Sequence, residues 1–179
     1  MKHVISALTA LSLVFVSTSF AQDVVVPYEN MVSVLSGHHG MPDSAYFARL
    51  KPDTARETLM KIAGDETVFP VARARALLAL AYFKTDAATS MVADKAANDT
   101  NPYMRSSAYE ALGNMEGASA VKTIGAGLKD SDVMVRLSAI RSLGKIGGAE
   151  AKKLLEDNLP AEKNSTAAVV MKNSIEQMR

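Results

Sequence analysis

Residues 130–148 read DSDVMVRLSAIRSLGKIGG, and a looser copy, DTNPYMRSSAYEALGNMEG, occupies residues 99–117. The shared positions recur at a constant offset, since Arg105 and Arg136 lie 31 residues apart, as do the alanine, leucine and glycine positions that follow them. A third stretch, FPVARARALLALAYF at residues 69–83, matches the second copy at an offset of 32 residues. Such a period indicates an array of small structural repeats.

Hydrophobicity within each repeat follows the period of an α-helix. Val135, Ala139 and Leu143 are spaced four residues apart, which places them on one face of a helix. Weaker matches at the same period, such as Ile124 and Leu155, lie between the strong copies. Each repeat therefore contains two helices, and the chain is predicted to be all-α.

Two amphipathic helices cannot bury both apolar stripes within one pair, so neighbouring pairs must pack against them. We expect an α-solenoid of about four stacked helix pairs. The first helices of the pairs are predicted near residues 53–63, 86–98, 117–128 and 149–158. The second helices are predicted near residues 69–83, 102–115, 132–146 and 164–178.

The residue pattern of the repeat resembles HEAT repeats, in particular the short HEAT-like class of phycobilisome lyases. The resemblance covers residues 52–179 and is strongest over residues 99–148. The positions that carry it in the clearest copy are Asp130, Val135, Arg136, Ala139, Leu143, Gly144 and Gly147. It implies a solenoid fold and an adaptor or scaffold, since only a minority of such proteins are enzymes.

Residues 1–21 have the composition of a secretory signal peptide. Lys2 precedes an uncharged apolar run, residues 4–16, and the small residues Ser19 and Ala21 stand where signal peptidase requires short side chains. The run has 13 residues, fewer than the roughly 20 of a membrane-spanning helix. We expect a periplasmic or secreted protein that is not inserted in the membrane after the signal is removed.

Residues 22–51 match no repeat and are expected to form an irregular or short-helical amino-terminal cap. A short helix begun by Asp43 or Ser44 is predicted within them. Residues 52–179 form the repeat domain. At its far end Ala167 or Ala168 replaces the repeated arginine, and the polar outer face of the last helix is typical of a terminal capping repeat.

Charge and cysteine content exclude several classes of partner. The chain has 20 basic and 19 acidic residues, and one lysine lies in the signal peptide, so the mature chain is expected to carry no net charge. Such a chain lacks the basic patch that binds phosphate backbones, and we expect no nucleic-acid partner. The absence of cysteine excludes disulfides and a lipid-modified amino-terminal cysteine.

The repeated arginines allow two interpretations. They could line a groove that binds carboxylates or phosphates, or they could bridge aspartates in the turns and tie one repeat to the next. A stacking contact must recur at every step whereas a substrate site needs one constellation, so the structural ladder is favoured. The ladder residues are Arg73, Arg105 and Arg136 with Asp99 and Asp130.

Two histidines in the sequence Ser-Gly-His-His-Gly-Met, residues 36–41, raise the question of a metal site. Imidazole and thioether ligands suit copper. Adjacent histidines rarely complete a site without further ligands, however, and the chain has no cysteine and no HExxH motif. We interpret His38 and His39 as part of a capping loop, and we predict neither a metal nor a cofactor.

The concave surface of the second helices is the predicted place of function. Its side chains differ between repeats, which suits recognition of one extended protein or peptide partner on a regular frame. The partner-binding residues predicted there are Arg75, Tyr82, Tyr103, Glu110, Met134, Arg141 and Lys145. No catalytic constellation is recognisable, so we expect no enzyme. The alternative is a HEAT scaffold that binds a small molecule, a bilin or a metal, or acts as a lyase.

Overall fold

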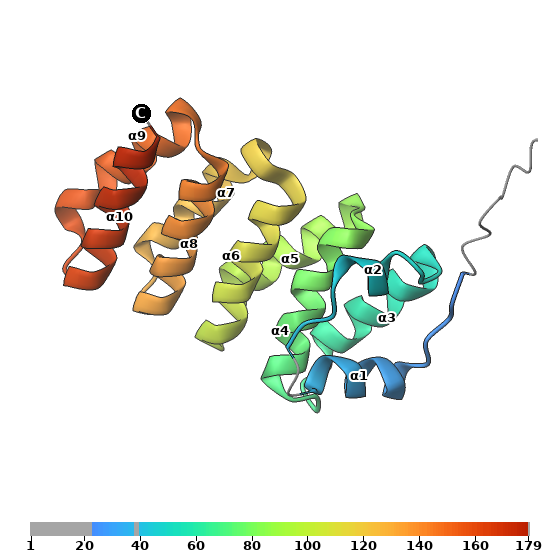
Figure 1. Cartoon of the computed structure of the whole chain (residues 1–179). Coiled ribbons are helices and arrows are strands. Elements are labelled where there is room, and N and C mark those ends of the chain that lie inside the picture. The colour runs from blue at the N-terminus through green and yellow to red at the C-terminus, as the bar shows by residue number, and fades with distance from the viewer. Residues whose placement is uncertain (1–22, 38–39, 179) are drawn as a thin grey trace, which may run out of the picture.

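The computed structural model describes residues 23–37 and 40–178, which form a row of helix pairs stacked in sequence order (Figure 1). This architecture is the predicted α-solenoid, and within the described residues the single β-type pairing is an isolated bridge between Val24 and Leu50. The expected signal peptide, residues 1–21, and the two histidines of the capping loop lie outside the described residues.

The first helices of the four pairs are α3 (Pro52–Gly64), α5 (Asp86–Asn98), α7 (Val121–Ala126) and α9 (Gly148–Asn158). The second helices are α4 (Pro70–Ala79), α6 (Pro102–Glu116), α8 (Val133–Ile146) and α10 (Ser165–Gln177). Short 3-10 helices follow or flank them: η1 (Leu80–Phe83), η2 (Gly117–Ala120), η3 (Gly127–Lys129) and η4 (Leu159–Ala161).

Helix α7 is much shorter than the single helix that the sequence predicted over residues 117–128. The segment instead runs from η2 through α7 into η3. Gly125 and Gly127 lie in its second half, and glycine costs about 1 kcal/mol relative to alanine within a helix. The weak helix propensity of this segment agrees with its division into one short α-helix and two 3-10 helices.

The second helices pack side by side as one layer, with α6 between α4 and α8, and α8 between α6 and α10. The first helices form the layer behind them (Figure 1). Val135, Ala139 and Leu143 are fully buried between the layers, as their spacing predicted. No helix among the described residues is long and apolar enough to span a bilayer.

The glycines of the repeat allow close contact between second helices of successive repeats. A Cβ atom on Gly113 of α6 would lie 3.3 Å from Cβ of Ser142 in α8, and one on Gly144 would lie 2.9 Å from Oγ of Ser174 in α10. These contacts are made with the second helix of the following repeat and not with the first helix of the same pair. The glycines instead set the distance from each repeat to the next.

The amino-terminal cap contains α1 (Tyr28–Ser36) and α2 (Ser44–Phe47), and it covers the first repeat through contacts of α1 with α3 and α4. Asp43 begins α2 as predicted, since its Oδ1 accepts the N–H of Tyr46 at 2.9 Å. Helix α1 was not predicted. Its signal was the four-residue spacing of Met31 and Leu35, both of which are buried against the repeats.

Candidate functional site

Each helix pair has an acidic residue at the same place in the turn between its two helices. In the second and third turns, the carboxylates of Asp99 and Asp130 accept the N–H two residues further on, at 2.9 and 2.8 Å. The residue at that next position, Asn101 or Asp132, then caps the second helix. The four acids in this position are Asp65, Asp99, Asp130 and Glu162.

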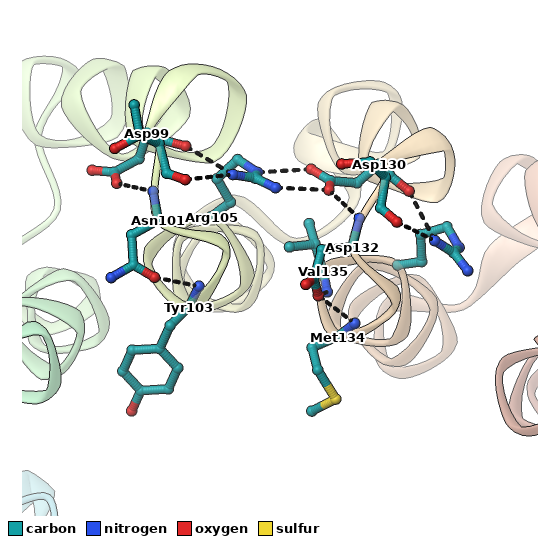
Figure 2. Close-up of polar contacts among 11 residues, drawn as sticks. Asp99, Asn101, Tyr103, Arg105, Asp130, Asp132, Met134 and Val135 are labelled. Atoms are coloured by element: carbon teal, nitrogen blue, oxygen red, sulfur yellow. Dashed lines mark hydrogen bonds and ion pairs between the residues drawn. The ribbon is translucent and has the colours of Figure 1, made fainter.

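The repeated arginines connect these turns. Nε and Nη2 of Arg105 donate to both carboxylate oxygens of Asp130 at 2.8 and 2.9 Å (Figure 2). Its Nη1 donates to the backbone carbonyls of Asp99 and Thr100 at 3.0 and 3.3 Å. Arg105 thus binds the backbone carbonyl of Asp99, the acid of its own repeat, and the carboxylate of Asp130, the acid of the following repeat.

Arg136 repeats this arrangement one step along the stack. Nε and Nη2 donate to the carboxylate of Glu162 at 2.7 and 3.0 Å, and Nη1 donates to the carbonyls of Asp130 and Ser131, both at 3.0 Å. From the sequence, Asp99 and Asp130 were assigned to the ladder as its acids, and Asp65 was considered as a more distant one. Glu162 was missed because it is a glutamate, although its offset from Asp130 fits the repeat.

The contacts change at the amino-terminal end of the stack. Nη2 of Arg73 lies 3.8 Å from Oδ2 of Asp99. Nε of Arg73 donates a hydrogen bond of 3.4 Å to the carbonyl of Ala63, which is longer than the hydrogen bonds of Arg105 and Arg136. In the first turn, Asp65 accepts the hydroxyl of Tyr28 from the cap at 2.6 Å. A tyrosine of the cap therefore occupies the place that an arginine of a preceding repeat would take.

Hydrogen bonds within the ladder stabilise the ionised carboxylates. Bonding to Arg105 lowers the pKa of Asp130, and bonding to Arg136 lowers the pKa of Glu162, against the opposing effect of partial burial. In the cap, the hydrogen bond to Asp65 raises the pKa of Tyr28 to about 12. Arg105 and Arg136 each donate four hydrogen bonds within the protein, which is the geometry of a structural contact.

The outward surface of the second helices, which we call the second-helix face, carries exposed apolar side chains. Tyr103 is 48% exposed and Met134 is 56% exposed, and they project to the same side from the first turns of α6 and α8 (Figure 2). Val71 occupies the equivalent position on α4, and Tyr82 lies at the other end of that helix in η1; both are exposed.

A groove of about 230 Å³ lies on this face between α6 and α8. Four of the residues predicted to bind a partner line it: Glu110, Met134, Arg141 and Lys145. Its floor includes Ser138 and Ser142, whose hydroxyls donate to backbone carbonyls of α6 at 2.8 and 3.4 Å. Small side chains let the two helices approach, and the longer side chains form the walls.

A second groove of about 400 Å³ continues toward α4. It is lined by Leu78 and Tyr82, by Met41 from the cap, and by Glu110 and Lys145, which it shares with the first groove. Asn114 also lines both grooves and accepts a hydrogen bond from Lys145 at 2.8 Å. The shared residues make the two grooves one continuous depression across three second helices.

Arg75 has a different environment from the other predicted partner-binding residues. Its Nη1 donates to the carbonyls of Leu35 and Gly37, both at 2.7 Å, at the end of α1. These contacts hold the cap against the first repeat. Tyr82 is also in contact with the cap, because its ring stacks on that of Phe47 with centroids 4.8 Å apart.

Among the described residues, no three His, Cys, Asp or Glu side chains are grouped so that they could hold a metal ion. The histidines considered as copper ligands lie outside the described residues.

The stacked two-helix repeats and their arginine ladder define an α-solenoid protein. Comparison with family models gives the finer assignment, because residues 89–171 match HEAT repeats. Residues 89–171 therefore carry HEAT repeats, as the sequence pattern predicted; the narrower likeness to phycobilisome lyases stays a prediction. A search of curated proteins found no match to this chain.

Proposed function

We propose that this protein is an exported binding module that docks a protein or peptide on its second-helix face. HEAT repeats commonly mediate interactions between proteins, and the composition of residues 1–21 supports export. The observation that carries the proposal is the exposure of large apolar side chains on this face. They are Val71, Tyr82, Tyr103 and Met134.

Tyrosine and methionine suit this role. Tyrosine offers a large rigid surface with one polar end, and methionine adapts its shape to different partners. Tyr103 and Met134 lie on adjacent helices, and their side chains are exposed to solvent. A partner that covers both side chains would bury their apolar surface, which favours binding. The ladder on the same helices keeps the distance between them fixed.

Site-specific photo-crosslinking tests the proposal. A crosslinking amino acid at Tyr103 should capture a discrete partner from the envelope or secreted fraction of the source cells, whereas the same group at Lys122, on the exposed surface of α7, should not. Binding of the captured partner should weaken about 10-fold or more for the variant Tyr103→Ala/Met134→Ala.

The matched control is Val24→Ala/Val25→Ala, which removes two exposed apolar side chains outside the second-helix face. It should bind the partner as the wild type does. Crosslinks that form at Lys122 and not at Tyr103, or equal weakening by both double variants, would contradict the proposed docking face.

A further inference from the structure

The charged side chains of the second-helix face are not distributed evenly. Arg141 and Lys145 of α8 and Glu110 of α6 line the groove between these helices, and all three are exposed. Within the described residues, none of them forms an ion pair; Lys145 bonds only to the neutral amide of Asn114. The groove therefore has two cationic groups, Arg141 and Lys145, and one anionic group, Glu110. Its lining thus carries an excess of one positive charge.

The apolar part of the depression lies on the other side of these charges. The second groove is lined by Leu78 and Tyr82 and by Met41 of the cap, and it meets the first groove at Glu110 and Lys145. A segment that lies across α4, α6 and α8 thus passes from an apolar region to a basic one.

We infer that the segment recognised on this face is an acidic peptide, which places a carboxylate side chain at Arg141 and Lys145 and an apolar side chain against Leu78, Tyr82 and Met41. The inference rests on the proposed function and adds the chemistry of the partner. The planar guanidinium of Arg141 matches a carboxylate by two parallel hydrogen bonds, and Lys145 adds a second positive charge.

Glu110 favours a peptide over a phosphate polymer. It lines the same groove as the two cations, so a ligand there must tolerate a carboxylate beside it. A peptide combines its acidic side chain with backbone N–H donors or a neighbouring basic residue that Glu110 can accept from. A nucleic-acid or polyphosphate chain has negative charge in every unit and meets repulsion at this position.

The span of the depression sets the length of the motif. Packed helices lie about 8–10 Å apart, so the distance from α4 to α8 across α6 is roughly 16–20 Å. An extended chain covers about 3.3 Å per residue, which makes this distance about five or six residues. We expect an apolar or aromatic residue at one end of such a segment and an aspartate or glutamate at the other.

Selection from a displayed library of random 12-residue peptides against the purified protein tests the inference. The enriched peptides should share an acidic residue about five residues from an apolar one. For an enriched peptide, Arg141→Glu/Lys145→Glu should weaken binding about 10-fold or more, and the neutral Arg141→Gln/Lys145→Gln should weaken it less. Melting curves of each variant establish that it is folded.

The control variant is Lys122→Glu/Lys129→Glu, which makes the same change in net charge at two exposed lysines of the first-helix layer. It should bind within about twofold of the wild type, since neither altered lysine lines either groove. Acidic peptides that bind this control as poorly as Arg141→Glu/Lys145→Glu would overturn the inference, because general charge attraction would then explain them.

Other outcomes separate this inference from the proposed function. Enriched peptides without an acid that still depend on Tyr103 and Met134 would refute the acidic motif and keep the docking face. Peptides insensitive to every second-helix variant would refute both. A dimer of this chain that dissociates in Arg141→Glu/Lys145→Glu would also overturn the inference, since the occupant would then be a second copy.

Discussion

Replacement of Arg136 by alanine tests whether the repeated arginines are structural. The change removes two hydrogen bonds to the carboxylate of Glu162 and two to turn carbonyls. Glu162, whose side chain is only 3% exposed, is left without its cationic partner, and the side chain of Arg136 is itself 17% exposed. Breaking a buried ion pair in this way costs about 3–5 kcal/mol, and partial exposure places Arg136→Ala near 2–3 kcal/mol.

The expected change is measurable by thermal or denaturant unfolding. In a domain of this size, 2–3 kcal/mol lowers the melting temperature by about 5–10 °C. A double-mutant cycle with Glu162→Gln should give a coupling energy of about 1–3 kcal/mol, because the two side chains share one contact. Binding of a partner to the second-helix face should be retained while the variant is folded.

Arg56→Ala is the matched control. Arg56 forms an ion pair with Asp53, whose side chain is 76% exposed, and such surface pairs contribute about 0–1 kcal/mol. If Arg136→Ala lowers stability no more than Arg56→Ala does, the ladder contributes little and its periodicity requires another explanation. Loss of partner binding by a fully folded Arg136→Ala would also contradict the structural role.

Three further predictions follow from the packing and the electrostatics. The arginines lower the pKa values of Asp130 and Glu162, so the contribution of these carboxylates to stability is present above about pH 4 and is lost as pH falls through the folded-state pKa. The variant Glu162→Gln should therefore flatten the decline of melting temperature between about pH 5 and pH 3. An unchanged slope would contradict this assignment. Gly113→Val should lower stability by about 1–3 kcal/mol in denaturant unfolding, since its side chain would meet Ser142, and a neutral result would show that the helices can separate without cost. Arg75→Ala should increase amide hydrogen exchange in α1 and leave α8 unchanged, because Arg75 holds the end of α1; equal exchange in both proteins would refute that role.

The repeat pattern was sufficient to predict the helix pairs, because burial of each apolar stripe depends mainly on local spacing. The second helix near residues 132–146 corresponds to α8, Val133–Ile146. The positions that the four-residue period selected, Val135, Ala139 and Leu143, are among its buried residues. Recurrence also favoured a structural role for the arginines, since an equivalent contact at each turn requires the same residue at each turn.

The sequence did not determine which acid each arginine would bind. Arg105 is close in sequence to Asp99 but binds the carboxylate of Asp130, because stacking brings the next turn within reach of its side chain. The same limitation applies to Gly113, whose neighbour in α8 is set by the distance between repeats. Contacts between repeats depend on three-dimensional register, whereas sequence spacing specifies only the contacts along one helix.

The candidate site was predicted in part for the same reason. Helical periodicity places Glu110, Arg141 and Lys145 on the outward face, and the structure brings them to one groove. Helical periodicity could not show that Arg75 would bind the end of α1, since the cap has no repeat pattern that would position α1. Helix α1 is short and its apolar signal consists of two residues, so its place against α4 emerged only from the fold.

The affinity of a crosslinked partner for two folded variants tests the central claim most directly. The claim is that the repeated arginines maintain the scaffold and the variable second-helix face binds. Arg136→Ala should melt earlier yet bind normally, whereas Tyr103→Ala/Met134→Ala should melt as the wild type does and bind at least about 10-fold more weakly. Normal binding by the face variant together with lost binding by the ladder variant would contradict this division of roles.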